Sequence, residues 1–183
     1  MCTCYNLLSL HLSAIKVTEA FIRSWHDYAV LALLETDFPK HDTQCLASRL
    51  GLTVKSTSAA LKRLLRLGLI EWNARSKKYR ASGKMVRVGK TGHYPLIHQR
   101  HVRQMRDSTK LMEELYEKKL HGISDISSVM IAVDSDKIPT ARERIKQFRR
   151  SVGTYLATGR RNAVYSLSIQ LLPISRHWEN SDP

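Results

Sequence analysis

The sequence has 183 residues, 43% of them hydrophobic, which is enough to bury the core of one domain or two small ones. Three cysteines are too few for a disulfide framework, and no apolar run approaches the roughly 18 residues of a membrane span. A disulfide-stabilised secreted domain and a membrane protein are therefore not expected. The amino terminus has no basic segment before its apolar stretch, which argues against a secretory signal, so we expect a cytoplasmic protein.

The formal net charge of +14 comes from one part of the chain. Residues 39–106 hold 16 lysines and arginines against only two acids, Asp42 and Glu71, while the rest of the chain is balanced. Such a cluster creates a positive potential that attracts phosphate backbones. A membrane surface would also be attracted, and a solvated basic face that serves only solubility is the plainer alternative.

The amino-terminal part is predicted to be an arm, residues 1–16, followed by a helix over about residues 18–37. The apolar positions of this helix recur every three or four residues from Phe21 to Leu33, as on one face of an amphipathic helix. Pro39 ends the helix, because proline disfavours helical geometry at the residue before it. We expect the helix to support the core.

Two short helices joined by a glycine are predicted next. Asp42 or Thr43 can cap the first helix, and Gly51 supplies the left-handed residue that ends it. Thr53 caps the second helix, which runs to Gly68. This arrangement is a helix-turn-helix.

A hairpin is predicted to follow, with strands at 69–72 and 78–82 around the polar loop NARSKK. Trp72 and Tyr79 lie on the facing strands. They could stack on bases of single-stranded nucleic acid, but aromatic pairs at such positions more commonly pack across a hairpin. The hairpin would form the wing of a winged helix.

The stretch LASRLGLTVKSTSAALKRLLRLGLIEWNARSKKYRAS resembles the winged helix of bacterial transcription regulators of the multiple-antibiotic-resistance regulator type, over residues 25–82 with the supporting helix. The L-G-L-T turn, the leucine spacing and the G-L-I before the hairpin occur together and in order. With ISDISSVMIAVDSDKIPTARERIKQFRRSV and VYSLSIQLLPIS, most of the chain is similar to a bacterial family defined only as a carboxy-terminal domain of unknown function behind a winged helix. This resemblance supports an architecture more than an activity.

The carboxy-terminal half is predicted to contain a long helix over residues 95–120 and then a strand-helix-strand unit. Its strands are expected at 127–134 and 163–172, and the helix between them has apolar positions from Ile138 to Tyr155. The predicted fold class is α+β, with a winged helix-turn-helix domain (17–90), a linker and dimerisation helix (91–121), a small carboxy-terminal module (122–175) and a tail (176–183).

The strand-helix-strand unit would be marginal by itself, because its two strands leave open edges. Pairing with a second copy would cover those edges. We therefore expect a homodimer, formed by the carboxy-terminal module and the long helix, as a regulator with two half-sites requires. Whether the module also binds a small effector stays open.

The candidate DNA-binding residues are those left outward when Val54, Thr57 or Ser58, Leu61, Leu64 and Leu65 of the second helix turn inward. Of these outward residues, Lys55, Ser56 and Ala59 would reach base edges in the major groove. Lys62, Arg63 and Arg66 lie later in the helix and would meet phosphates. Cations at the tip of the hairpin would contact the backbone or the adjacent minor groove. In chain order the set is Lys55, Ser56, Ala59, Lys62, Arg63, Arg66, Arg75, Lys77 and Lys78.

Metal and catalytic sites have weaker support. His93, His98 and His101 have a spacing that could hold zinc, but no further ligand lies nearby in the sequence, so surface or core histidines are expected. Asp125, Asp134 and Asp136 are better explained as turn and cap residues than as an acid/base or metal group. No catalytic motif occurs, and no cofactor or metal is predicted.

The expected function is that of a sequence-specific regulator of transcription that binds double-stranded DNA as a homodimer. The main alternative is a protein-interaction or signalling adaptor whose winged helix does not bind DNA. An enzyme that acts on nucleic acid is a distant third. The position of the positive charge distinguishes the DNA-binding regulator from the adaptor, since an adaptor does not need its whole cationic excess in the helix-turn-helix region.

Overall fold

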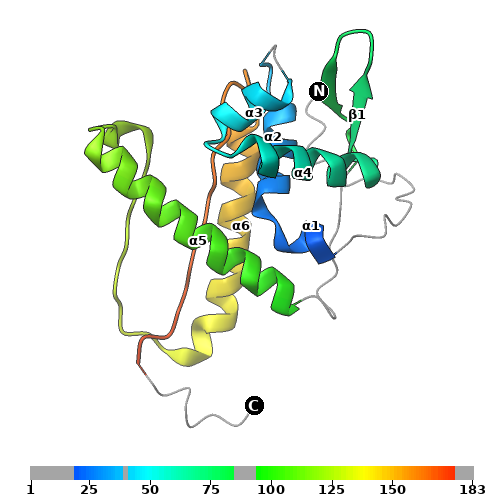
Figure 1. Cartoon of the computed structure of the whole chain (residues 1–183). Helices are drawn as coiled ribbons and strands as arrows, with labels where there is room; N and C mark the ends of the chain where they lie inside the picture. The colour runs from blue at the N-terminus through cyan, green and yellow to red at the C-terminus, as the bar shows by residue number, and fades with distance from the viewer. Residues whose placement is uncertain (1–18, 39–40, 85–93, 176–183) are drawn as a thin grey trace. The chain divides into compact units, whose positions relative to one another are not determined.

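The computed structural model describes residues 19–38, 41–84 and 94–175 (Figure 1). These residues fall into two compact units. The amino-terminal unit contains the described residues up to 127 together with residues 160–164, and the carboxy-terminal unit contains residues 128–159 and 165–175. The described chain is a mixed α+β structure with six α-helices and one two-stranded antiparallel sheet.

The supporting helix is divided into α1, Glu19–Arg23, and α2, Trp25–Leu34. The sequence predicted one continuous helix, but Ser24 between the two has an extended backbone with φ −101° and ψ 105°. Its hydroxyl donates a 2.8 Å hydrogen bond to the Asp27 carboxylate. Serine side chains that bond locally compete in this way with a continuous helix, and here α2 begins afresh after the serine.

The two short helices that the sequence predicts are α3, Thr43–Arg49, and α4, Val54–Arg66. Both predicted amino-terminal caps are confirmed. The side chains of Asp42 and Thr53 each accept a hydrogen bond from the backbone N–H three residues later, at 2.8 and 3.1 Å. Gly51 follows α3 with φ +61°, and nothing lies within 4 Å of where its Cβ would be, so it is the backbone conformation that favours glycine.

The hairpin is formed by β1, Ile70–Asn73, and β2, Lys78–Ala81, which pair antiparallel. Trp72 lies opposite Tyr79, and the centroids of the two rings are 4.6 Å apart. The prediction of cross-strand packing is therefore confirmed. Asn73 also stabilises the turn, because its side-chain oxygen accepts a hydrogen bond from the Ser76 N–H at 3.0 Å.

The core of the amino-terminal unit lies where α1, α2, α3, α4 and the hairpin meet. The inner face of α4 differs from the prediction at two positions, because Val54 is 51% exposed and Leu65 is 36% exposed. Instead the helix buries four residues at intervals of three or four, Thr57, Ala60, Leu61 and Leu64. The buried hydrophobic residues of the unit are Phe21, Ile22, Val30, Leu33, Leu34, Leu46, Ala47, Ala60, Leu61, Leu64, Leu67, Leu69 and Ile70.

The long helix α5, Tyr94–Glu117, belongs to the same unit and packs on α1 and α2. The indole Nε1 of Trp25 donates to the Asp107 carboxylate at 2.8 Å, and the Arg100 guanidinium lies 4.6 Å from the centre of the Tyr28 ring. These contacts attach α5 to α2. A 3-10 turn, His121–Ile123, follows the helix.

Residues 160–164, which follow the carboxy-terminal unit's residues 128–159, belong again to the amino-terminal unit. The Asp37 N–H donates to the Arg161 carbonyl at 2.8 Å, and the Asp37 carboxylate accepts from the Arg161 N–H at 2.9 Å. Three residues later, the partly buried Val164 packs against the core. The start of the segment predicted as the last strand is thus held by the amino-terminal unit.

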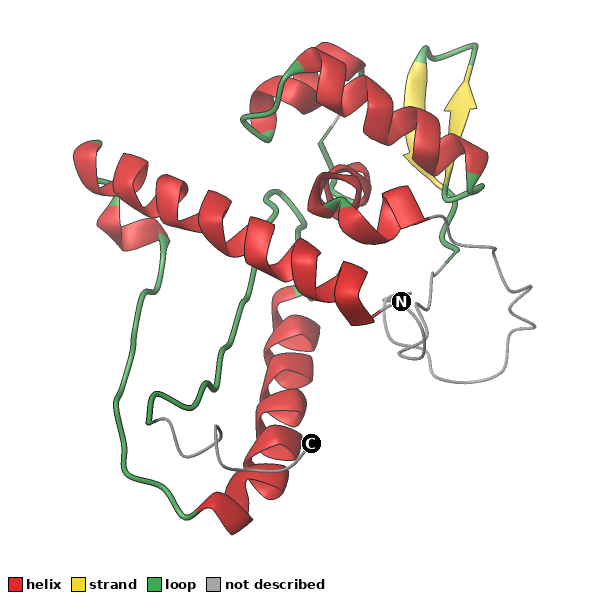
Figure 2. Cartoon of the chain, turned by 60° about the horizontal axis from the view of Figure 1, so that its bottom comes forward, coloured by secondary structure: helices red, strands yellow, loops and turns green. Residues whose placement is uncertain are grey.

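The carboxy-terminal unit contains the helix α6, Ile138–Leu156, preceded by a 3-10 turn, Ser135–Lys137. The predicted helix is confirmed, but the predicted strands at 127–134 and 163–172 are not formed, and Figure 2 draws both segments as green loops. A strand exists only where a second strand supplies its hydrogen bonds, and these segments do not pair within the described chain. The strand-helix-strand prediction is wrong for a single copy.

No helix within the described ranges combines the length and the apolar character that crossing a membrane requires.

Candidate nucleic-acid interface

The outer face of α4 is cationic. Burial of Thr57, Leu61 and Leu64 on one side of the helix sends Lys55, Lys62 and Arg66 to the other, where all three are exposed. The predicted contact residues Ser56 and Ala59 lie half-buried beside them. Since Lys55, Ala59, Lys62 and Arg66 are spaced by three or four residues, they form one stripe along the helix, and Ser56 lies beside it.

The stripe begins at the capped end of α4. Thr53, the N-cap, accepts from the Ser56 N–H and also donates its hydroxyl to the Ser56 side chain at 3.1 Å. The first turn of the helix is therefore ordered by side chains of its own sequence. Lys55 lies in this turn, so the cap fixes the backbone that carries it.

Loss of this cap should have a measurable cost. The variant Thr53→Ala should lower the free energy of unfolding by about 1 kcal/mol, because a first-turn N–H of α4 loses its acceptor. Urea denaturation checks this, with Thr109→Ala as the matched control. The Thr109 hydroxyl bonds the Met105 carbonyl inside α5, at a position where alanine is the better helix former. Equal effects of the two changes would contradict the capping role.

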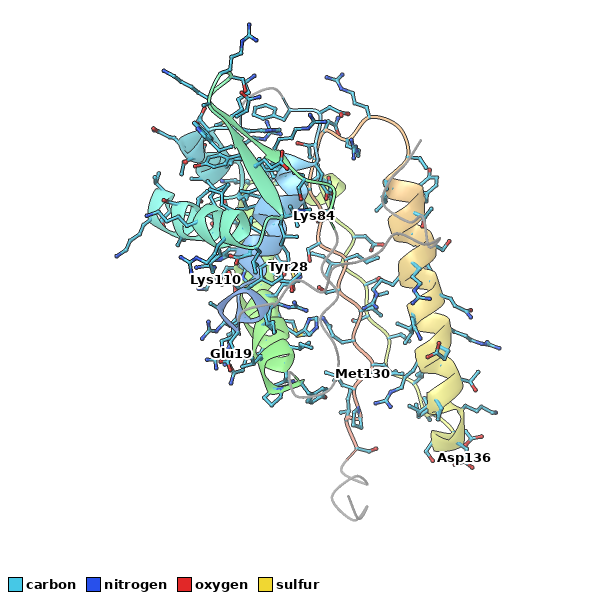
Figure 3. All side chains as sticks on the ribbon, turned by 90° about the vertical axis from the view of Figure 1, so that its right-hand side faces the viewer. Glu19, Tyr28, Lys84, Lys110, Met130 and Asp136 are labelled. Atoms are coloured by element: carbon cyan, nitrogen blue, oxygen red, sulfur yellow. The ribbon has the colours of Figure 1, made fainter. Side chains whose placement is uncertain are left out.

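Exposed cations also lie on the hairpin that follows α4. Gly68, with φ +66°, ends the helix. Its carbonyl accepts a 2.9 Å hydrogen bond from the hydroxyl of Ser82, the residue that follows β2. The Ser82 N–H also donates to the Leu69 carbonyl at 2.9 Å. The base of the hairpin is thus tied to the end of α4, while side chains that end in nitrogen atoms project from its tip (Figure 3). The predicted cations at the tip are all exposed, and they are Arg75, Lys77 and Lys78.

Arg63 lies on the inner side of α4, apart from the other predicted contact residues. Its Nη2 and Nε donate to the two carboxylate oxygens of Asp27 at 2.6 and 2.8 Å, a bidentate pair between α4 and α2. The Asp27 side chain is 0% exposed and that of Arg63 is 25% exposed. Hydrogen bonding to Asp27 raises the pKa of the Arg63 guanidinium above its ordinary value, since the charged form is the one that donates. The charge of Arg63 is already matched inside the protein, so its clearest role is to hold α4 in place.

The sequence did not point to Asp27. A signal was present, because Asp27 stands in line with the buried Val30 and Leu34 at helical spacing, where an apolar residue would be expected. An acid at a core position requires a cationic partner. The sequence alone could not show that this partner is Arg63.

A groove of about 900 Å³ lies beside Arg63, between α5 and the α1–α2 pair. Two of the five cations along its walls are already in ion pairs, Arg63 with Asp27 and Arg23 with Glu19. The other three cations, Arg103, Arg106 and Lys110, are opposed by two acids, so the groove has little excess charge. Its charged residues are Arg23, Arg63, Arg103, Arg106, Lys110, Asp107 and Glu113.

His26, on the wall of this groove, gives stability a dependence on pH. Burial lowers the pKa of its imidazole, against the opposing effect of the Asp107 and Asp27 carboxylates and with a smaller lowering by Arg63. The unfolded chain keeps the ordinary value of 6.5, so below that pH it binds more protons than the folded chain. The contribution of His26 to stability is thus present above pH 6.5 and is lost as the pH falls through the range below it.

The expected result is that His26→Gln flattens the fall in unfolding free energy between pH 7.5 and pH 5.5. Urea denaturation at several pH values measures it. The control is His98→Gln, at an exposed histidine of α5, which should leave the original dependence in place. Identical pH profiles for the original protein and the His26 variant would refute the assignment.

The histidines and acids considered as alternative metal or acid/base sites lie as follows. His93 lies outside the described residues, and His98 and His101 are exposed on α5. No three histidine, cysteine or acidic side chains in the described ranges are grouped as metal ligands. Asp134 accepts from the Asp136 N–H at 3.1 Å before α6, which confirms that it is a turn and cap residue.

One protein family matches the chain over most of its length. Its description is "domain of unknown function (DUF4423)", and the match covers residues 10–174. No curated protein and no solved structure matches. The match includes residues of both compact units, so α3, α4 and α6 belong to the same family domain.

Proposed function

Since the chain belongs to the DUF4423 family, whose description names no activity, we propose a function from its geometry: it is a sequence-specific regulator of transcription that binds double-stranded DNA as a homodimer. In this proposal α3 and α4 form a helix-turn-helix, β1 and β2 form its wing, and α4 is the recognition helix. The arrangement is then a winged helix of the kind that the sequence resembles.

The observation that carries the proposal is the set of exposed cations on the outer face of α4 and at the hairpin tip. A helix that buries leucines on one face and exposes Lys55, Lys62 and Arg66 on the other has the shape and charge to enter a major groove. The hairpin begins four residues after α4 ends, so its cations extend the same surface along the duplex.

Each contact residue has a role in the proposal. Lys55, Ser56 and Ala59, in the amino-terminal half of α4, face base edges, where lysine and serine form hydrogen bonds and an alanine methyl contacts thymine. The later cations Lys62 and Arg66 contact phosphates, as do the three cations of the hairpin tip. Arg63 acts indirectly, because its pair with Asp27 sets the position of α4 on α2.

The test is selection of bound duplexes from a random pool by the full chain. We expect an imperfect palindrome whose half-sites are centred about 34 Å apart, because two recognition helices related by a two-fold axis enter successive major grooves. Affinity should fall steeply as salt is raised, since several cations displace counterions from phosphates. A pool that stays random, or binding that salt does not weaken, would contradict the proposal and favour the adaptor.

A further inference from the structure

We propose that the segments 127–134 and 163–172 become β-strands by pairing with the same segments of a second copy of this chain. The inference deepens the homodimer of the proposed function and rests on it for the number of copies. DNA binding plays no part in it. What carries it is the surface that a single carboxy-terminal unit leaves in water.

The carboxy-terminal unit has no buried side chain among its described residues. The helix α6 has apolar residues at helical spacing, yet Phe148 is 58% exposed and Tyr155 is 76% exposed. In the first segment, Val129 is 78% exposed and Met130, labelled in Figure 3, is 86% exposed. An amphipathic helix whose apolar residues are at most partly buried, followed or preceded by exposed apolar segments, marks an interface, because soluble monomers rarely keep so much contiguous apolar surface in water.

The two segments have the sequence of strands. Residues 129–133 form an uninterrupted apolar run, and the second segment alternates, with Tyr165, Leu167, Ile169 and Leu171 on one side and small or polar residues between them. Figure 1 draws both segments extended, the first in yellow-green and the second in orange. Extended backbone of this composition is the template to which another strand adds.

The charge of the segments indicates what that other strand is. Although the chain carries a net charge of +14, neither 126–133 nor 162–175 contains a single charged side chain. A nucleic acid or an acidic partner would gain nothing there, whereas a second neutral, apolar strand loses no charge solvation on pairing. A two-fold axis brings identical segments together and covers both surfaces at once.

The supply and the size of the interface also favour a second copy. The exposed apolar surface of the carboxy-terminal unit needs a partner that is present in the same amount as the chain itself. A second copy of the chain is always present in that amount. Stable interfaces use about 20 to 30 residues on each side. The two segments together with the apolar stripe of α6 supply about that many.

The experiment compares Ile169→Asp with its neighbour Gln170→Asp in the full chain. Both add one negative charge to the same segment, but Ile169 lies on the apolar side and Gln170 on the polar side. Light scattering should find two 21.0 kDa chains in the original protein and in Gln170→Asp. Ile169→Asp should raise the dissociation constant of the dimer at least about 100-fold, because a carboxylate would be buried in the apolar interface.

Hydrogen exchange locates the pairing. The backbone amides of 128–133 and 164–171 should be protected in the dimer and should exchange fast in the monomeric Ile169→Asp protein. Three results would overturn the inference: an original protein that is monomeric at micromolar concentration, a dimer whose segments exchange fast, or protected segments in the Ile169→Asp monomer, which would mean pairing within one chain.

Two controls separate this inference from the proposed function and from misfolding. The Ile169→Asp monomer should keep the protected amides of α2 and α4, since that core belongs to the other unit. A dimer with protected segments that selects no DNA sequence would remove the proposed function and leave this inference standing. An original protein that is monomeric and still selects a single half-site would remove this inference and the homodimer, and would leave only sequence-specific DNA binding standing.

Discussion

Replacing Arg63 by methionine should lower the free energy of unfolding by about 3 to 5 kcal/mol. The carboxylate of Asp27 is fully buried, and Arg63 supplies two of its hydrogen bonds, the third coming from the Ser24 hydroxyl. Methionine keeps the apolar stem of arginine but removes the guanidinium, so the carboxylate would remain in the core without a counter-charge. Urea denaturation followed by circular dichroism measures the loss.

Arg66→Met is the matched control for this change. Arg66 lies on the same helix three residues later but is exposed, so its replacement should alter the free energy of unfolding by no more than about 0.5 kcal/mol. The double variant Asp27→Asn with Arg63→Met should recover a large part of the loss, because no buried charge is then left unpaired. An Arg63 variant as stable as the original protein would show that the pair does not hold α4 on α2.

The parts of this fold that follow from neighbouring residues could be predicted from the sequence. Asp42 and Thr53 cap helices within one turn of their own positions, and Trp72 meets Tyr79 across a short hairpin. The exposed positions of Lys55, Lys62 and Arg66 follow from the same local periodicity. For this reason most of the predicted cationic surface is present at the expected residues.

The parts that depend on distant segments could not be predicted. Asp27 and Arg63 are 36 positions apart, and their pairing requires α2 and α4 to pack together first. The same packing decides that Ala60 faces the core while Val54 and Leu65 do not. The apolar periodicity predicts that the helix has a buried face, but the packing against a second helix determines which residues lie at the centre of that face.

The segments 127–134 and 163–172 show another limit of sequence patterns. Their β-branched and alternating residues indicate strands. A strand, however, forms only beside a second segment, and the pattern of one segment does not identify the segment that pairs with it. The absence of strands in one chain and the pattern in the sequence are compatible if the missing partner belongs to a second copy. In that proposal the pairing surface belongs to the carboxy-terminal unit, whereas α4 belongs to the amino-terminal unit.

The Lys55→Ala variant should weaken binding to the selected duplex by about 1 to 3 kcal/mol and should relax the base preference at one position of each half-site. Lys55 is exposed in the first turn of α4, where alanine is well tolerated, so the fold should not change. The measurement is the dissociation constant for the selected duplex and for duplexes with single base changes, all at one salt concentration.

Lys77→Ala is the matched control, since Lys77 is an exposed lysine at the hairpin tip. Its loss should weaken binding to all duplexes alike and reduce the salt slope by about one, because a phosphate contact carries no sequence information. The comparison between the two lysines tests the assignment better than either alone. If Lys55→Ala weakened every duplex equally, α4 would lie along the backbone rather than in the groove, and if it bound the selected duplex as tightly as the original protein, α4 would not be the recognition helix.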